Sequence, residues 1–393
     1  MNDKMHKFPL ALNNHNKTKK IGTFAIVSLL VSGCKSQQFL SSFDGIESSY
    51  FDQISFDSDS SGLEYSFSCS ADDTTQTSEN DEFEEHANCF DLSQIEYKIS
   101  VLNELKRKSD DYETFIFYTD HHCFLPNGTY DIDASLLEFE LKSVARISDL
   151  SESEFVVFGG DLLNNSDTKS QACYKLSTYV KMMDCFFTKY YLLVGNHDFN
   201  SQGDTYIASG DYLACMLSQE TINDILFDGG QSFYKFKTNS TSYYCFDSGI
   251  GYYADYQKKQ ILWLANDLLK DDNENKVFFI HIALVDGNYA LTEMMLEIGK
   301  IIEGFNNKIE VQIADCCFDY SSSFGTVSFV QAGHSHQDIN SFNCGSVPVI
   351  VSTSFGSPEA VSRPTFDIVF IDHTYSLVNC LRIGDGEDRV FSI

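Results

Sequence analysis

The sequence predicts an α/β fold whose functional residues gather at one edge of a sheet. Short apolar runs rich in Val, Ile and Phe indicate buried strands. Stretches with helical spacing separate the first three runs, and such alternation of strand and helix is typical of α/β folds. Side chains able to bind metals follow five of the runs. The carboxyl ends of strands are where α/β folds bind their ligands.

The first predicted helix covers Leu92–Lys108, where isoleucines and leucines recur three or four residues apart and so fall on one face. Similar stretches at Ala134–Ile147 and Gln171–Phe187 predict the helices that separate the first three strands. Further along, Met294–Ile298 suggests a helix packed over the site, although methionine-rich stretches of this kind usually belong to a core.

Each of the five strands leads into a cluster of metal-competent residues. In chain order the strands and clusters are Phe115–Tyr118 with Asp120, His121 and His122; Phe155–Phe158 with Gly159, Gly160 and Asp161; Tyr191–Val194 with Gly195, Asn196, His197 and Asp198; Val277–Ile280 with His281; and Val327–Val330 with Gly333, His334, Ser335 and His336. Each cluster alone occurs by chance, since Gly-Asp is a common turn and a lone histidine is usually structural. The ordered set, each member behind a strand, makes coincidence improbable, and we expect these side chains to meet on one rim.

This ordered set resembles the calcineurin-like metallophosphoesterase superfamily, whose pattern is D-x-H, G-D, G-N-H-[DE], H and G-H-x-H. Every element lies between residues 120 and 336, and the likeness covers most of residues 114–382. The segment 244–269, in which a strand precedes a helix headed by Gln260 and Trp263, is similar to related members too. The resemblance implies a four-layer α/β/β/α sandwich, with two mixed sheets packed face to face and flanked by helices.

The resemblance also implies a centre of two metal ions that are bridged by Asp161. Asp, Asn and His supply the oxygen and nitrogen ligands that suit Mn, Fe or Zn. Two such ions can share a hydroxide, which is then the nucleophile, and clamp phosphate oxygens. The implied ligands are Asp120, His122, Asp161 and His336 for one ion, and Asp161, Asn196, His281 and His334 for the other.

Two catalytic roles follow from the same resemblance. His197 is expected to face the substrate and to act as the general acid that protonates the leaving oxygen. Asp198 either orients His197 or is a simple turn carboxylate. His121 is expected to point away from His122, because side chains alternate along an extended chain.

The charge of the chain is strongly negative, at −30 from 57 Asp and Glu against 27 Lys and Arg. A hydrophobic fraction of 43% excludes a wholly disordered protein. The acidic balance argues against a broad basic face, so no stable binding of nucleic acid is expected. Residues 41–97 carry 15 Asp and Glu and no Lys or Arg. We therefore interpret 34–90 as an acidic, Ser-rich and extended tether, and 91–393 as the phosphoesterase domain.

Residues 1–33 have the layout of a lipoprotein-type signal peptide. Basic residues precede the apolar run Ile21–Leu30, and small residues lead to Cys34. The run is shorter than the roughly 20 residues that a membrane-spanning helix needs. This interpretation predicts cleavage before Cys34, lipidation of its thiol, and a lipid-anchored protein on the outer face of the cell membrane. Secretion, or an ordinary uncleaved apolar segment, is the alternative. The 12 cysteines include no C-x-x-C pair and leave the redox state open.

The leading hypothesis is a metal-dependent hydrolase of phosphomonoesters or phosphodiesters, whose partner is a small phosphoester. A non-catalytic surface protein that keeps the fold for binding or adhesion is the alternative. Retention of every expected ligand favours the enzyme. Specificity is expected to lie in Asn200–Gln231 and Asp286–Phe324, which carry few basic residues and so favour small substrates over long polyanions.

Overall fold

The chain divides into two compact units, Met1–Ser68 and Cys69–Ile393, and the computed structural model describes residues of the second only. The predicted signal peptide, Cys34 and the tether up to residue 89 lie outside the described residues. No helix within the described part is long and apolar enough to cross a membrane. The described residues are 90–122, 134–164, 168–200, 215–247, 258–282, 293–356 and 363–393.

The first sheet of the described domain has six strands in the order β14-β13-β12-β1-β2-β3. Strands β1, β2 and β3 run parallel, and β12, β13 and β14 continue the sheet antiparallel. The parallel part brings the carboxyl ends of β1, β2 and β3 to one edge. The strands are β1 (Tyr112–Tyr118), β2 (Phe155–Phe158), β3 (Tyr190–Leu192), β12 (Phe366–Asp372), β13 (Leu377–Ile383) and β14 (Arg389–Ser392).

The second sheet also has six strands among the described residues, in the order β10-β11-β9-β6-β5-β4. Its central strands β5, β6, β9 and β11 are parallel, and β4 and β10 are antiparallel edges. The strands are β4 (Tyr234–Lys237), β5 (Thr241–Cys245), β6 (Asn275–Ile282), β9 (Thr326–Gly333), β10 (Ile339–Cys344) and β11 (Val347–Val351). A separate hairpin is formed by β7 (Glu310–Ile313) and β8 (Cys316–Asp319).

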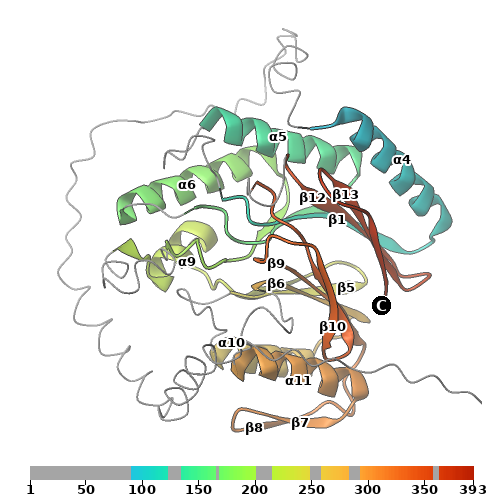
Figure 1. Ribbon diagram of the computed structural model, residues 1–393. Coiled ribbons are helices and arrows are strands. Elements are labelled where there is room, and N and C mark those ends of the chain that lie inside the picture. The colour runs from blue at the N-terminus through green and yellow to red at the C-terminus, as the bar shows by residue number, and fades with distance from the viewer. Residues whose placement is uncertain are drawn as a thin grey trace, which may run out of the picture. The chain divides into compact units, whose positions relative to one another are not determined.

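Helices cover the outer face of each sheet (Figure 1). Four pack on the first sheet and two on the second, so the predicted four-layer sandwich of two mixed sheets is confirmed. The helices are α4 (Leu92–Lys108), α5 (Ala134–Leu150), α6 (Lys169–Phe186) and α9 (Gln219–Phe227) on the first sheet, and α10 (Lys258–Leu268) and α11 (Glu293–Asn307) on the second.

Helix α11 distinguishes the two positions considered for the methionine-rich stretch. The helix exists where the methionine-rich stretch predicts one, but Ile298, Ile301 and Phe305 pack against the outer face of the second sheet. It therefore contributes to the core on the outer side of the second sheet. The two stretches expected to be specificity loops also contain secondary structure, since α9 lies in the first and α11 with the β7–β8 hairpin lies in the second.

The last four residues of strand β1, Phe115–Tyr118, are apolar because both faces of the strand are buried there. Phe115 and Phe117 point into the core between the sheets, whereas Ile116 and Tyr118 point into the core beneath the helices. A strand that is buried on both faces has no polar face to alternate with. Phe115 stacks on Phe155 of the same sheet, with ring centroids 5.0 Å apart. Each ring that is removed from water in this way contributes about 1.5–3 kcal/mol.

Helix α4 begins as the sequence predicts, because Asp91 caps it by accepting a hydrogen bond from the backbone N–H of Gln94. Three basic residues in its last turn complement the negative end of the helix dipole. Phe90, which the sequence places in the tether, is buried and its ring lies 6.2 Å from that of Phe139 on α5. The folded core therefore begins no later than Phe90.

The amino-terminal ends of the strands are joined by a polar cluster around Glu113 of β1. Its carboxylate accepts hydrogen bonds from the hydroxyls of Thr238 and Tyr243, which belong to the second sheet and its β4–β5 turn. Nε2 of His373 lies 3.4 Å from Oε1 of Glu113. Burial alone would raise the pKa of Glu113, but these partners hold it below its ordinary value of 4.5. Burial lowers the pKa of His373, but the neighbouring carboxylate of Glu113 raises it, and the pKa ends above its ordinary value of 6.5.

Replacement of Glu113 by Gln is expected to lower the free energy of unfolding by about 1–3 kcal/mol, because Tyr243 and His373 lose a buried charged partner. The contribution of Glu113 is present above pH 4.5 and is lost as the pH falls through its lowered pKa. The contribution of His373 is present below pH 6.5 and is lost as the pH rises through its raised pKa. The difference from wild type should therefore be largest between these values. Urea unfolding across this pH range measures it.

A matched control is Glu104→Gln, since Glu104 is exposed on α4 and pairs only with Lys108 one turn away among the described residues. Its free energy of unfolding should follow that of wild type at every pH. A difference for Glu113→Gln that does not change with pH would contradict the role given to the ion pair.

Candidate metal centre

The turns that follow β1 and β2 lie side by side at one edge of the first sheet. The ends of these strands are paired in register. Beyond them, the backbone N–H of Asp120 donates to the carbonyl of Gly160 over 2.9 Å, and that of His122 donates to the carbonyl of Asp161 over 3.0 Å. The parallel pairing thus continues past the strands and places the first two sequence clusters together.

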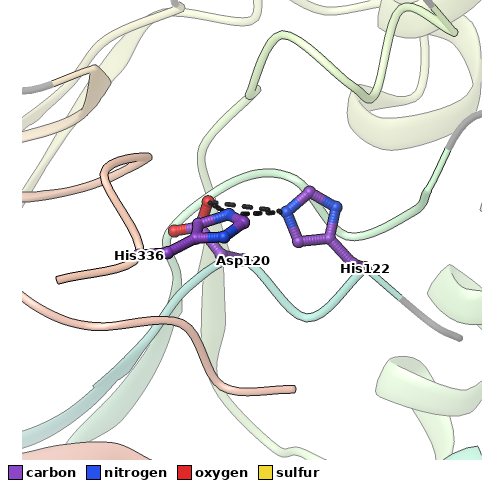
Figure 2. Close-up of side chains that lie close together, drawn as sticks. All are labelled: Asp120, His122 and His336. Atoms are coloured by element: carbon purple, nitrogen blue, oxygen red, sulfur yellow. Dashed lines mark hydrogen bonds and ion pairs between the residues drawn. The ribbon is translucent and has the colours of Figure 1, made fainter. Parts of the chain in front are cut away.

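One group of candidate ligands consists of Asp120, His122 and His336, which come from both sheets (Figure 2). Their ligand atoms all lie within 4.8 Å of one another. Nε2 of His336 is 3.2 Å from Oδ1 of Asp120, and the Nε2 atoms of His122 and His336 are 2.9 Å apart. This spacing is suitable for three ligands around one ion.

A second group consists of Asp161, His281 and His334, again within 4.8 Å. Nε2 of His281 lies 3.0 Å from Oδ2 of Asp161 and 3.9 Å from Oδ1 of Asp120. A third group of the same compactness is formed by His122, Asp161 and His197. Asp161 therefore belongs to two groups, and the groups form one continuous cluster.

Five of the candidate ligands have left-handed backbones, a conformation that favours glycine. Their φ angles are 56° at Asp120, 53° at His122, 53° at Asp161, 71° at His334 and 52° at His336. Each such residue costs about 1–3 kcal/mol and persists only where its surroundings impose the conformation. The sharp turns at the strand ends aim these side chains into the cluster, so this strain has a functional reason.

Hydrogen bonds to the carboxylates hold the strained turns in place. Oδ2 of Asp120 accepts the backbone N–H of His334 over 2.8 Å and the hydroxyl of Thr119 over 2.7 Å. Oδ1 of Asp161 accepts the backbone N–H of His197 over 2.7 Å. One oxygen of each carboxylate thus accepts the hydrogen bonds that hold the turns in place. The other oxygen faces the imidazole rings of the candidate ligands.

Asp198 supports the backbone rather than the ring of His197. Its buried carboxylate accepts the backbone N–H groups of Asp161 and Gly195 at Oδ2 and that of Leu162 at Oδ1, over 2.8–3.0 Å. Burial and the nearby charge of Asp161 raise the pKa of Asp198 to about 7. Of the two roles considered for Asp198, these contacts match the turn carboxylate: Asp198 ties the turn after β3 to the turn after β2.

The electrostatics of the cluster centre on two carboxylates that are removed from water. Burial works against ionisation of Asp120, but the charge of His281 and the hydrogen bond from His336 lower its pKa to about 2. Burial also opposes the charge on His281, yet Asp161 and Asp120 raise its pKa to about 10. The carboxylates are ionised and therefore require positive charge beside them.

The donor atoms fit divalent metal ions. Burial lowers the pKa of both His122 and His334 to about 4, so both are neutral at pH 7 and carry the lone pair that a metal needs. Oδ1 of Asp120 is buried and faces imidazole nitrogens of His122, His281 and His336 at 3.2–3.9 Å. Buried polar atoms of this kind are expected where an ion completes the site. The oxygen and imidazole set suits Mn, Fe or Zn.

The structure brings together most residues that the sequence singles out. Asn196 is buried and lies on the same turn as His197. His121 points away from the cluster as predicted, toward Glu140 and the hydroxyl of Tyr179. Cys34 lies outside the described residues.

Two supporting residues were missed by sequence reasoning. Thr119 directly precedes the first motif and supports Asp120, as described above. The hydroxyl of Ser354 donates to the carbonyl of Asp120 over 2.7 Å. Adjacency to the motif could have indicated Thr119, but nothing in the sequence marks Ser354, which follows a different strand.

Comparison with known proteins places the chain in a family. The model of the calcineurin-like phosphoesterase family matches residues 113–338. No curated protein matches the chain. Similar solved structures include a dimetal phosphatase from Danio rerio (13% identity, TM-score 0.48, 71% of this chain and 98% of that one) and purple acid phosphatase PPD1 from Lupinus luteus (13%, 0.45, 72% and 54%). Another is calcineurin-like phosphoesterase YfkN from Bacillus subtilis (11%, 0.35, 72% and 88%).

The chain belongs to the calcineurin-like phosphoesterase family. It is accordingly a metal-dependent hydrolase that acts on phosphoric ester bonds.

Gly195 offers a steric test of the centre, because a Cβ at this position would collide with the carboxylate and the backbone nitrogen of Asp161. Gly195→Ala is expected to displace Asp161, to reduce the number of bound metal ions, and to lower the free energy of unfolding by about 1–3 kcal/mol. Metal content measured by mass spectrometry, together with urea unfolding, checks both effects.

Gly299→Ala is the matched control, since a Cβ there would meet only Sγ of Cys344, at 3.8 Å, and the residue lies within α11. This variant should keep the wild-type metal content and gain slightly in stability, because alanine favours a helix over glycine. Full metal content in Gly195→Ala would contradict the geometry described above.

Proposed function

We propose that this enzyme hydrolyses small phosphomonoesters or phosphodiesters at a centre of two metal ions. Asp120, His122, Asp161 and His336 would hold one ion, and Asp161, Asn196, His281 and His334 would hold the other. The observation that carries the proposal is the pair of three-residue groups with Asp161 beside both. Bound there, two ions would supply the positive charge that binds phosphate and would lower the pKa of water.

The residues of the chain supply the negative charge and the fixed geometry that such ions need. Asp120 and Asp161 offer two charges, and the neutral imidazoles of His122 and His334 offer lone pairs without adding charge. Two divalent ions therefore leave the pocket positive inside an acidic protein. A phosphate dianion or diester anion would be attracted to this local charge, because the charge of distant acidic residues is screened within about 8 Å.

His197 is assigned the role of general acid. Its ring lies close to His122, with centroids 4.9 Å apart, and a ring nitrogen falls within the group that contains Asp161. Unlike the carboxylates, His197 is partly exposed, so a substrate can reach it. A proton donated from this ring to the leaving oxygen would neutralise the alkoxide as the ester bond breaks.

The assignment predicts that His197→Ala depends on the leaving group. An alkyl alkoxide needs a proton, so kcat/KM for an alkyl phosphate should fall by about 10²–10⁴. p-Nitrophenolate leaves without one, so the loss for p-nitrophenyl phosphate should be much smaller. Metal content should be unchanged, because His197 is not assigned as a ligand. Steady-state kinetics on both substrates and metal analysis of the same samples measure these effects.

His373→Ala is a suitable control, since this histidine lies among the amino-terminal strand ends beside Glu113. It should change kcat/KM for both substrates little and equally. Equal losses on the two substrates for His197→Ala would contradict the general-acid role, and loss of a metal ion would make His197 a ligand instead. Metal-loaded wild type that cleaves no phosphoester in a broad panel would favour the alternative of a non-catalytic binding protein.

We further propose that the enzyme is anchored by a lipid at Cys34 on the outer face of a bacterial cell membrane. The layout of residues 1–33 supports this. In addition, Cys185 is disulfide-bonded, a state typical of exported proteins. The proposal predicts that the full chain, expressed in a bacterium that processes lipoproteins, takes up radiolabelled palmitate and sediments with membranes.

Cys34→Ser should lose the palmitate label and the membrane association, while Cys69→Ser should keep both. Release of the wild-type chain into the medium without label would instead support secretion.

A further inference from the structure

The turn that carries His336 depends on contacts made outside its own strand. His336 has a left-handed backbone, and its carbonyl accepts the hydroxyl of Thr353 over 2.9 Å. The backbone N–H of the same Thr353 donates to Oδ1 of Asp338 over 3.1 Å. Asp338 lies two residues after His336 and just before β10. Thr353 and Asp338 therefore close a small ring around the strained residue.

Asp338 is itself held by an arginine of the other sheet. Nη1 of Arg382 lies 3.0 Å from Oδ2 of Asp338, and Nη2 lies 2.6 Å from Oδ1. A two-pronged pair of this kind fixes the direction of a carboxylate as well as its position. Arg382 is on β13 and is fully buried, with 0% of its surface exposed. The pair thus connects the first sheet to the turn that follows β9 of the second.

Further charges complete the network and keep it balanced. Nε of Arg382 donates to Oδ1 of Asp367 over 2.8 Å, and Nη2 of Arg389 donates to its Oδ2 over 2.7 Å. Nη1 of Arg389 also lies 3.3 Å from Oδ1 of Asp338. Two arginines and two aspartates therefore alternate, so the buried charges of Asp367 and Arg382 each have partners of opposite sign, while Asp338 lies at the exposed end of the network. We call Asp338, Asp367, Arg382 and Arg389 the charge clamp.

The segment that follows β11 links the charge clamp to the metal centre at three successive residues. The hydroxyl of Ser352 donates to Oδ2 of Asp367 over 2.6 Å. Thr353 connects Asp338 to His336, and Ser354 holds the carbonyl of Asp120. A shift of the charge clamp would therefore move the backbones of His336 and Asp120, which face each other.

We propose that Asp338 is a positioning residue: held by Arg382, it fixes the turn of His336 so that this ligand meets Asp120 across the two sheets. The inference rests on the proposed metal centre and adds to it. The family match ends at residue 338, whereas the other members of the charge clamp lie beyond it. The β13–β14 hairpin carries Arg382 and Arg389. It would thereby help to position one of the metal ligands.

The test is calorimetric titration of the metal-free protein with Mn²⁺. Wild type is expected to bind two ions. Asp338→Asn should weaken one of the two steps by about 10-fold or more, because residues that support a ligand typically have this effect, and leave the other step unchanged. Asp385→Asn is the matched control, since Asp385 lies between β13 and β14, near Arg382 in the chain, but its carboxylate pairs with Arg363 at 3.0 Å. It should bind Mn²⁺ as wild type does.

A second pair of variants keeps the inference testable if Asp338→Asn folds poorly. Thr353→Val removes the hydroxyl that reaches His336 and should weaken the same step, whereas Thr353→Ser keeps it and should bind normally. Circular dichroism verifies that the variants are folded. Wild-type binding in both Asp338→Asn and Thr353→Val would overturn the inference and leave the proposed function intact. Absence of Mn²⁺, Fe²⁺ and Zn²⁺ binding in wild type would overturn both.

Discussion

Two ionised carboxylates, buried at the ends of neighbouring strands, are the constraint on which the rest of the structure depends. Asp120 and Asp161 have 0% and 1% of their surfaces exposed. Charges in such a place are unstable unless opposite charge and hydrogen bonds surround them. The left-handed turns, the imidazoles from both sheets and the donor groups of Thr119 and His197 all meet this need. The four packed layers hold these parts at a fixed separation, which a metal centre requires.

Local patterns in the sequence could predict much of this arrangement. Helix Leu92–Lys108 and strand Phe155–Phe158 have the bounds that periodicity and composition indicate. These elements are predictable because burial on one or both faces leaves a direct pattern in the residues. The candidate ligands could be recognised because their order along the chain follows the order of the strand ends. The charge of the chain was less informative, since the charge that matters for phosphate is confined to the cluster.

Features that arise from contacts between distant segments could not be predicted. Asp198 looks like a partner of the adjacent His197, and only the folded turns reveal that it accepts backbone groups of Asp161 and Leu162 instead. Helix α11 could be located but not placed, because an apolar face does not specify which sheet surface it covers. Arg382 is an ordinary strand residue in the sequence, and its burial becomes meaningful only when Asp338 and Asp367 are beside it.

The topology of the first sheet also determines when the enzyme can form during its synthesis. Strand β1 lies between β2 and β12, and β12 is synthesised after β1, β2 and the turn of His336. Until then β1 has an open edge and the turn of His336 lacks Arg382, so the chain emerges without a finished centre. Pairing between such distant segments is intrinsically slow. Metal acquisition is therefore expected to follow the pairing of β12 with β1 rather than to precede it.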